Sequence, residues 1–95
     1  MPIFLAIPLT SPPETLKKAV EAHIEESDRY QLTNNRGWLI RYSGTSVELS
    51  NHLKISGQPK GVPAEVGSAL VTLVSSYYGR APTDMWEWIQ TRWEK

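Results

Sequence analysis

The chain has 95 residues, with ten basic side chains balancing ten acidic ones, two histidines and no cysteine. This length predicts a single domain, residues 1–95. The lack of cysteine excludes disulfides and thiolate metal sites. A domain of this size buries only about 60–65% of the surface that its unfolded chain exposes, so its stability depends on a good core or on self-association. Proteins that neutralise many phosphates usually carry a basic excess, so zero net charge disfavours general nucleic-acid binding and leaves only a local patch open.

The first nine residues form an apolar run, and we expect residues 3–9 to be a buried strand. Pro8 cannot donate a ladder hydrogen bond, so strand pairing should end there or leave that side open. The run has no basic leader, and no stretch reaches the ~20 apolar residues that span a bilayer. We therefore expect a cytoplasmic protein with no membrane partner.

A first helix is predicted over residues 12–27. Ser11 and Glu14 have the spacing of a capping box, and Pro12 suits the first helical position. Apolar or half-apolar residues then recur on one helical face: Leu16, Ala19, Val20, His23 and Ile24.

The middle of the chain predicts a hairpin followed by a short helix. Residues 30–33 and 38–42 are strand-like, and the turn chemistry of residues 34–37 lies between them. Thr45 and Glu48 form a second capping-box pattern, which begins a helix of about two turns that stops before Gly57.

The last third predicts a loop, a strand and a helix. Residues 56–63 are rich in glycine and proline, as in mobile or functional loops. Residues 69–75 are nearly continuous in apolar character, so we expect them to form a central strand. Thr83 is the expected N-cap of a helix over residues 84–93.

This order of elements predicts an α+β fold. Strand, helix, strand, strand, helix, strand is the βαββαβ pattern of a ferredoxin-like split βαβ sandwich, with one helix added at the C-terminus. Its antiparallel sheet would pack its helices on one face and expose the other.

Motifs for chemistry are lacking in the sequence. There is no cysteine nucleophile, no Gly-x-Ser-x-Gly and no phosphate-binding fingerprint. His23 fits the rim of the core and His52 the surface, while the acidic residues 25, 26 and 28 fit a solvated helix end. We therefore expect no catalytic residues, no metal and no cofactor, and a small hydrolase with an unfamiliar site ranks last.

Large aromatic residues supply the leading hypothesis. Three tryptophans on one short helix exceed what a single buried stripe hides, and we expect Trp88 to be the exposed one. Exposed aromatics are typical interface anchors. The sequence thus predicts a non-enzymatic interaction protein that acts as a homodimer or small homo-oligomer, with the interface candidates Trp86, Trp88 and Trp93.

The alternative is a nucleic-acid or nucleotide binding protein. Cationic and aromatic side chains together can bind phosphates and stack on bases. The ligand-binding candidates are Trp38, Arg41, Tyr77, Tyr78 and Arg80, with Arg36 in addition.

Residues 3–75 resemble the small CRISPR-associated adaptation nuclease subunits and their stand-alone relatives. The similarity lies in the leading apolar strand, the long first helix, the strand pair ending in Tyr42-Ser-Gly-Thr-Ser46, and the short second helix. In that family an aspartate at the end of the first strand implies metal-dependent phosphodiester cleavage. Here residues 6–10 contain no acid, which puts nuclease activity in doubt.

Overall fold

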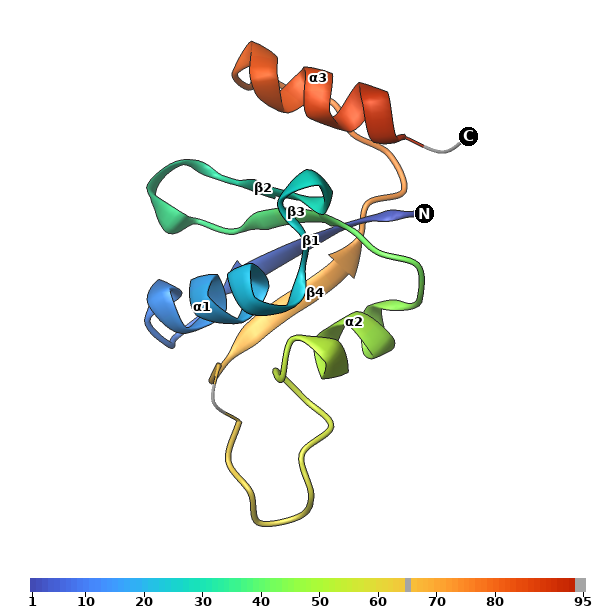
Figure 1. Ribbon diagram of the computed structural model, residues 1–95. Coiled ribbons are helices and arrows are strands. Elements are labelled where there is room, and N and C mark those ends of the chain that lie inside the picture. The colour runs from blue at the N-terminus through green and yellow to red at the C-terminus, as the bar shows by residue number, and fades with distance from the viewer. Residues whose placement is uncertain (65, 94–95) are drawn as a thin grey trace.

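A four-stranded antiparallel sheet lies at the centre of the computed structural model, which describes residues 1–64 and 66–93. The strands are β1 (Ile3–Pro8), β2 (Arg29–Gln31), β3 (Trp38–Arg41) and β4 (Ala69–Leu73). Their order across the sheet is β2-β3-β1-β4, and each neighbouring pair is antiparallel (Figure 1). The predicted hairpin is confirmed, since β2 pairs with β3.

The prediction that residues 69–75 form a central strand is wrong, because β4 lies at an edge of the sheet and β1 and β3 are central. An apolar run indicates apolar neighbours above and below a strand. It carries no information about whether both edges are hydrogen-bonded. Pro8 behaves as predicted: it pairs with Ala69 on β4, while the pairing of β1 with β3 ends at Ala6.

Side chains of β1 alternate between two apolar cores, as the strand period of two requires. Phe4 and Ala6 point to the core under α1 (Pro13–His23) and α2 (Ser46–His52), and Ile3 and Leu5 point to the opposite face. Both faces of the sheet therefore carry a packed core.

Helix α1 is shorter than the predicted 12–27, and its N-terminus is built differently. It ends at His23, and the chain then forms a short 3-10 turn, η1 (Glu26–Asp28). The capping box predicted at Ser11 is wrong, because Pro12 is the N-cap and no side chain caps it. The Ser11 Oγ instead accepts the backbone N–H of Ser68 at 2.8 Å, and the Ser68 Oγ accepts that of Ser11 at 3.2 Å. A partner far along the chain has replaced the local one.

The second capping box is confirmed. Thr45 Oγ1 accepts the backbone N–H of Glu48 at 3.1 Å, and Glu48 Oε1 accepts that of Thr45 at 3.0 Å. A further 3-10 turn, η2 (Thr33–Asn35), joins β2 to β3.

Helix α3 (Thr83–Arg92) covers the face of the sheet opposite α1 and α2, so the expected open face is wrong (Figure 1). Pro82, and not Thr83, is its N-cap. Ile3 and Leu39 from the sheet pack with Trp88 and Ile89 from α3 in one buried cluster. Among the described residues, no helix is long and apolar enough to cross a membrane.

Candidate functional site

The ligand-binding residues predicted from the sequence do not meet in one place. Trp38 is 5% exposed and lies in the core beneath α1 and α2, so its ring offers no free face for stacking. Arg41 pairs with Asp28, with 2.7 Å between Nη2 and Oδ1. Tyr77, Tyr78 and Arg80 lie in the segment between β4 and α3, and Tyr77 packs on α3. Arg36 is exposed after η2.

Trp88 is buried, so the prediction that it is the exposed tryptophan is wrong. Its side chain is 9% exposed and packs in the cluster between α3 and the sheet. The Tyr30 ring lies 6.2 Å away, and the Arg92 guanidinium lies 4.6 Å over the indole. The face of α3 that meets the sheet passes through Trp88 and Ile89. Trp86 and Trp93 are left partly exposed.

These two tryptophans and the preceding tyrosines form what we call the aromatic surface: Tyr77, Tyr78, Trp86 and Trp93. Tyr77 stacks on Trp86 with ring centres 5.6 Å apart and meets the Trp93 ring edge-on at 4.9 Å. Tyr78 is fully exposed, and it borders a hollow of about 220 Å³ together with Tyr77, Gly79, Trp86 and Gln90. Three of the five residues around this hollow are aromatic.

Two polar contacts fix α3, and with it the aromatic surface, to the rest of the domain. The Tyr30 hydroxyl donates to Asp84 Oδ2 at 2.8 Å, and Arg92 Nε donates to the Ser27 carbonyl at 2.8 Å. Burial, together with this hydrogen bond and the charge of Asp84, raises the pKa of Tyr30 above its ordinary value of 10.0. The tyrosine is therefore a protonated donor throughout the neutral range.

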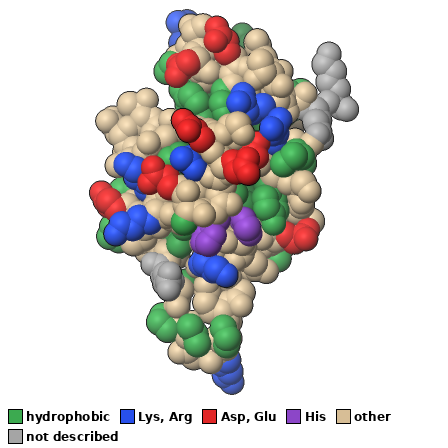
Figure 2. Space-filling model, viewed as in Figure 1, with side chains coloured by type: hydrophobic (Ala, Val, Ile, Leu, Met, Phe, Trp, Pro, Cys, Tyr) green, Lys and Arg blue, Asp and Glu red, His purple; other side chains and the backbone are tan. Residues whose placement is uncertain are grey.

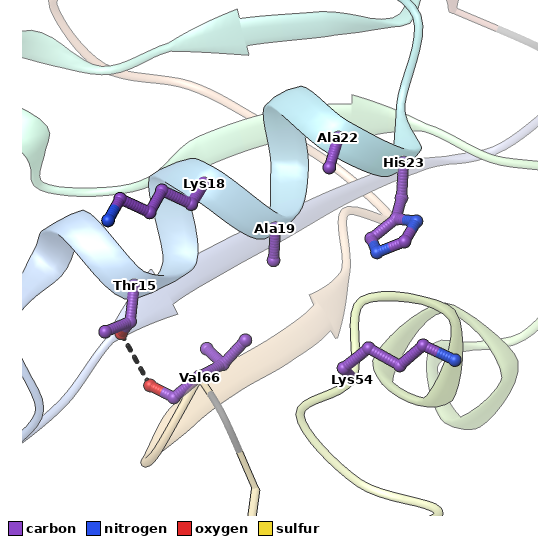
Figure 3. Close-up of a pocket in the computed structure, with 7 residues that line it drawn as sticks. All are labelled: Thr15, Lys18, Ala19, Ala22, His23, Lys54 and Val66. Atoms are coloured by element: carbon purple, nitrogen blue, oxygen red, sulfur yellow. Dashed lines mark hydrogen bonds between the residues drawn. The ribbon is translucent and has the colours of Figure 1, made fainter.

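A second feature, which we call the basic pocket, lies on the other side of the sheet, between α1 and the turn that follows α2 (Figure 3). Its volume is about 280 Å³, and its lining is Thr15, Lys18, Ala19, Ala22, His23, Lys54 and Val66. Thr15 Oγ1 donates to the Val66 carbonyl at 2.6 Å and closes one end. In Figure 3 the Lys18 and Lys54 side chains extend in opposite directions, away from one another, and the His23 ring lies on the Lys54 side.

The two histidines meet beside this pocket. Their ring centres are 5.6 Å apart, and His52 Nε2 is 3.1 Å from the His23 carbonyl oxygen. Figure 2 shows them side by side on the surface. Both are exposed, which confirms the prediction for His52 and moves His23 from the rim of the core to the surface.

The described lining of the pocket contains no carboxylate, and Arg41–Asp28 is the one ion pair between described residues.

None of the protein families, curated proteins or solved structures compared with this chain matches it. The resemblance to the CRISPR-associated adaptation subunits therefore stays a prediction. No group of three or more metal-ligating side chains comes together among residues 1–64 and 66–93.

Proposed function

We propose that the protein is a small non-enzymatic interaction protein that acts as a homo-oligomer, with a homodimer as its smallest form. One observation carries the proposal: the aromatic surface leaves a fully exposed tyrosine, Tyr78, beside a hollow that is lined mainly by aromatic residues. Aromatic side chains bring much apolar area to an interface at a low cost in conformational entropy. The zero net charge of the chain supports the proposal as well, because it offers little electrostatic repulsion between copies.

The ferredoxin-like arrangement is part of the same proposal. In the order β2-β3-β1-β4, strand β3 lies between β1 and β2, the two strands that α1 connects. This strand order is the one that a split βαβ unit requires, so it supports the proposal of a ferredoxin-like fold to which α3 is added. The arrangement leaves β4 at an edge, next in the chain to the aromatic surface.

Native mass spectrometry and light scattering of the untagged protein test self-association. We expect a dimer with no added mass, and we expect Tyr78→Ala to raise the dimer dissociation constant about tenfold, because exposed interface tyrosines are frequent hot spots. Val47→Ala is the matched control, since Val47 is exposed on α2, away from the aromatic surface. A wild-type chain that stays monomeric at high micromolar concentration contradicts the proposal.

A second candidate function, binding of an anionic ligand such as the phosphates of a nucleotide, is favoured by the basic pocket. Lys18 and Lys54 have no ion-pair partner among the described residues, and His23 adds a third nitrogen-bearing side chain. Lysine stems are flexible, so both ammonium groups can turn over the pocket mouth. Its volume of about 280 Å³ lies near the lower limit for small-molecule sites, so it suits phosphates more than a whole nucleotide.

Titration with adenosine triphosphate at low and high salt tests this second candidate. We expect binding that weakens as salt rises, and a loss of about tenfold in affinity for the double variant Lys18→Gln/Lys54→Gln. Lys60→Gln is the control, because this lysine is exposed but does not line the pocket. If the double variant and the control bind equally, the pocket is not the site.

A further inference from the structure

The free edge of β4 presents a row of backbone groups. At the two ends of the β1–β4 ladder, Val74 donates to the Ile3 carbonyl at 2.9 Å and Leu9 donates to the Ser68 carbonyl at 3.1 Å. Hydrogen-bonded residues alternate along an antiparallel strand. Residues 68, 70, 72 and 74 therefore face β1, and the N–H and C=O groups of Ala69, Val71 and Leu73 face outward.

No backbone partner for these three residues occurs among the hydrogen bonds that the described turns, loops and caps make. The pairing with β1 also explains why Pro8 is tolerated, since it lies opposite Ala69, at a position that makes no hydrogen bond in this ladder. The outward groups are thus available to another strand.

The edge lacks the devices that usually prevent strands of different molecules from pairing. Such edges are typically short, charged, bulged or interrupted by proline. β4 reads Ala-Leu-Val-Thr-Leu, and residues 66–79 contain no charged side chain. The opposite edge of the sheet, β2, does have features that disfavour pairing with another strand. It has only three residues, includes the charged Arg29, and lies between η1 and η2.

We propose that β4 pairs in antiparallel orientation with β4 of a second copy of this chain, about a two-fold axis at Val71. The inference rests on the self-association proposed above and identifies the strand that mediates it. In this register Val71 faces Val71 of the second copy, and Ala69 faces Leu73. All three outward residues of each copy then exchange both of their backbone hydrogen bonds, and the two sheets continue into one.

The side chains fit the same register. Leu73 is 52% exposed and meets the small Ala69 of the second copy, so a large residue faces a small one on both sides of the axis. On the other face of the sheet, Leu70 is 48% exposed and lies opposite Thr72 of the second copy. Pairing removes both leucines from water, places two β-branched valines at the centre and brings no like charges together.

A second copy suits this edge better than an unrelated strand, because the uncharged edge complements itself under two-fold symmetry. A standard interface buries roughly 800 Å² per partner, more than a five-residue strand supplies alone. The aromatic surface, which begins at Tyr77 shortly after β4, is the neighbouring apolar area that would extend it.

A charge pair tests the register. The double variant Leu70→Lys/Thr72→Lys sets lysine opposite lysine twice, and we expect its dimer dissociation constant to rise about tenfold or more. The matched variant Leu70→Lys/Thr72→Glu sets lysine opposite glutamate at the same two positions and is expected to keep the dimer. Circular dichroism of the two variants checks that both are folded.

A single cysteine tests the axis, since the natural chain has none. Residues in a hydrogen-bonded antiparallel pair lie about 5.5 Å apart at Cα, within reach of a disulfide. Oxidation should therefore link Val71→Cys into a covalent dimer, whereas Leu70→Cys and Val47→Cys should stay single chains. An oligomeric wild type with no link at position 71 and equal association of the two charge variants overturns this inference and leaves self-association standing. A monomeric wild type overturns both.

Discussion

Replacing Trp88 by alanine is expected to lower the free energy of unfolding by about 3–5 kcal/mol, the range for large aromatic residues in a core. The indole packs with Ile3 and Leu39 of the sheet and with Ile89 of its own helix. Alanine leaves a cavity there and removes the contact with the Arg92 guanidinium. Urea unfolding followed by circular dichroism measures the loss.

Trp88→Phe separates packing from polarity at the same position. The indole Nε1 is buried and has no hydrogen-bond partner among residues 1–64 and 66–93. A buried donor without a partner costs about 1–3 kcal/mol, and phenylalanine removes that donor while keeping most of the apolar ring. We therefore expect a clearly smaller loss than with alanine.

The interface role that the sequence suggested for Trp88 predicts the opposite result. An exposed interface tryptophan would change association and leave the free energy of unfolding within about 0.5 kcal/mol of the wild-type value. If Trp88→Ala behaves in that way, α3 does not dock through Trp88 as the structure has it.

Local chemistry made much of the fold predictable. The spacing of Thr45 and Glu48 fixes the start of α2, because both partners of each capping hydrogen bond lie within one helical turn. The turn residues between β2 and β3 likewise specify the hairpin, and Asn34 and Asn35 adopt the positive φ angles that such turns need.

Features that depend on distant parts of the chain were not predictable. Ser11 has an ordinary capping partner at Glu14, yet its hydroxyl binds the Ser68 backbone, which no local pattern reveals. The edge position of β4 follows from which strands pair, and an apolar run reads the same at an edge and at the centre. The basic pocket joins Lys18 on α1 to Lys54 in the turn after α2, two positions that meet only in the folded chain.

The tryptophans of α3 show that a sequence pattern can predict a buried helix face without predicting which residues lie on it. The sequence predicted one buried stripe on this helix, which the buried Ile89 agrees with. It did not predict the rotation of the helix, and a rotation by one residue position exchanges which indole is buried. Trp86 and Trp93 therefore remain interface candidates, while Trp88 has become a core residue.

Replacing Phe4 by alanine is the second change with a large expected effect, again about 3–5 kcal/mol of the free energy of unfolding. Phe4 is 1% exposed on the central strand β1, between Ile40 of β3 and Leu73 of β4, and its ring meets the Tyr42 ring edge-on. A domain of this size has only about 5–15 kcal/mol in total, so the variant should lose a large fraction of its stability.

The control for Phe4→Ala is Val47→Ala, because Val47 is 66% exposed and its truncation should change stability by less than about 0.5 kcal/mol.

Phe4 and Trp88 report on opposite faces of one sheet. If the two cores unfold together, both variants shift the urea midpoint and leave the slope of the transition unchanged. If α3 detaches first, Trp88→Ala splits the transition and Phe4→Ala does not. A Phe4→Ala protein as stable as the control would contradict the central position of β1.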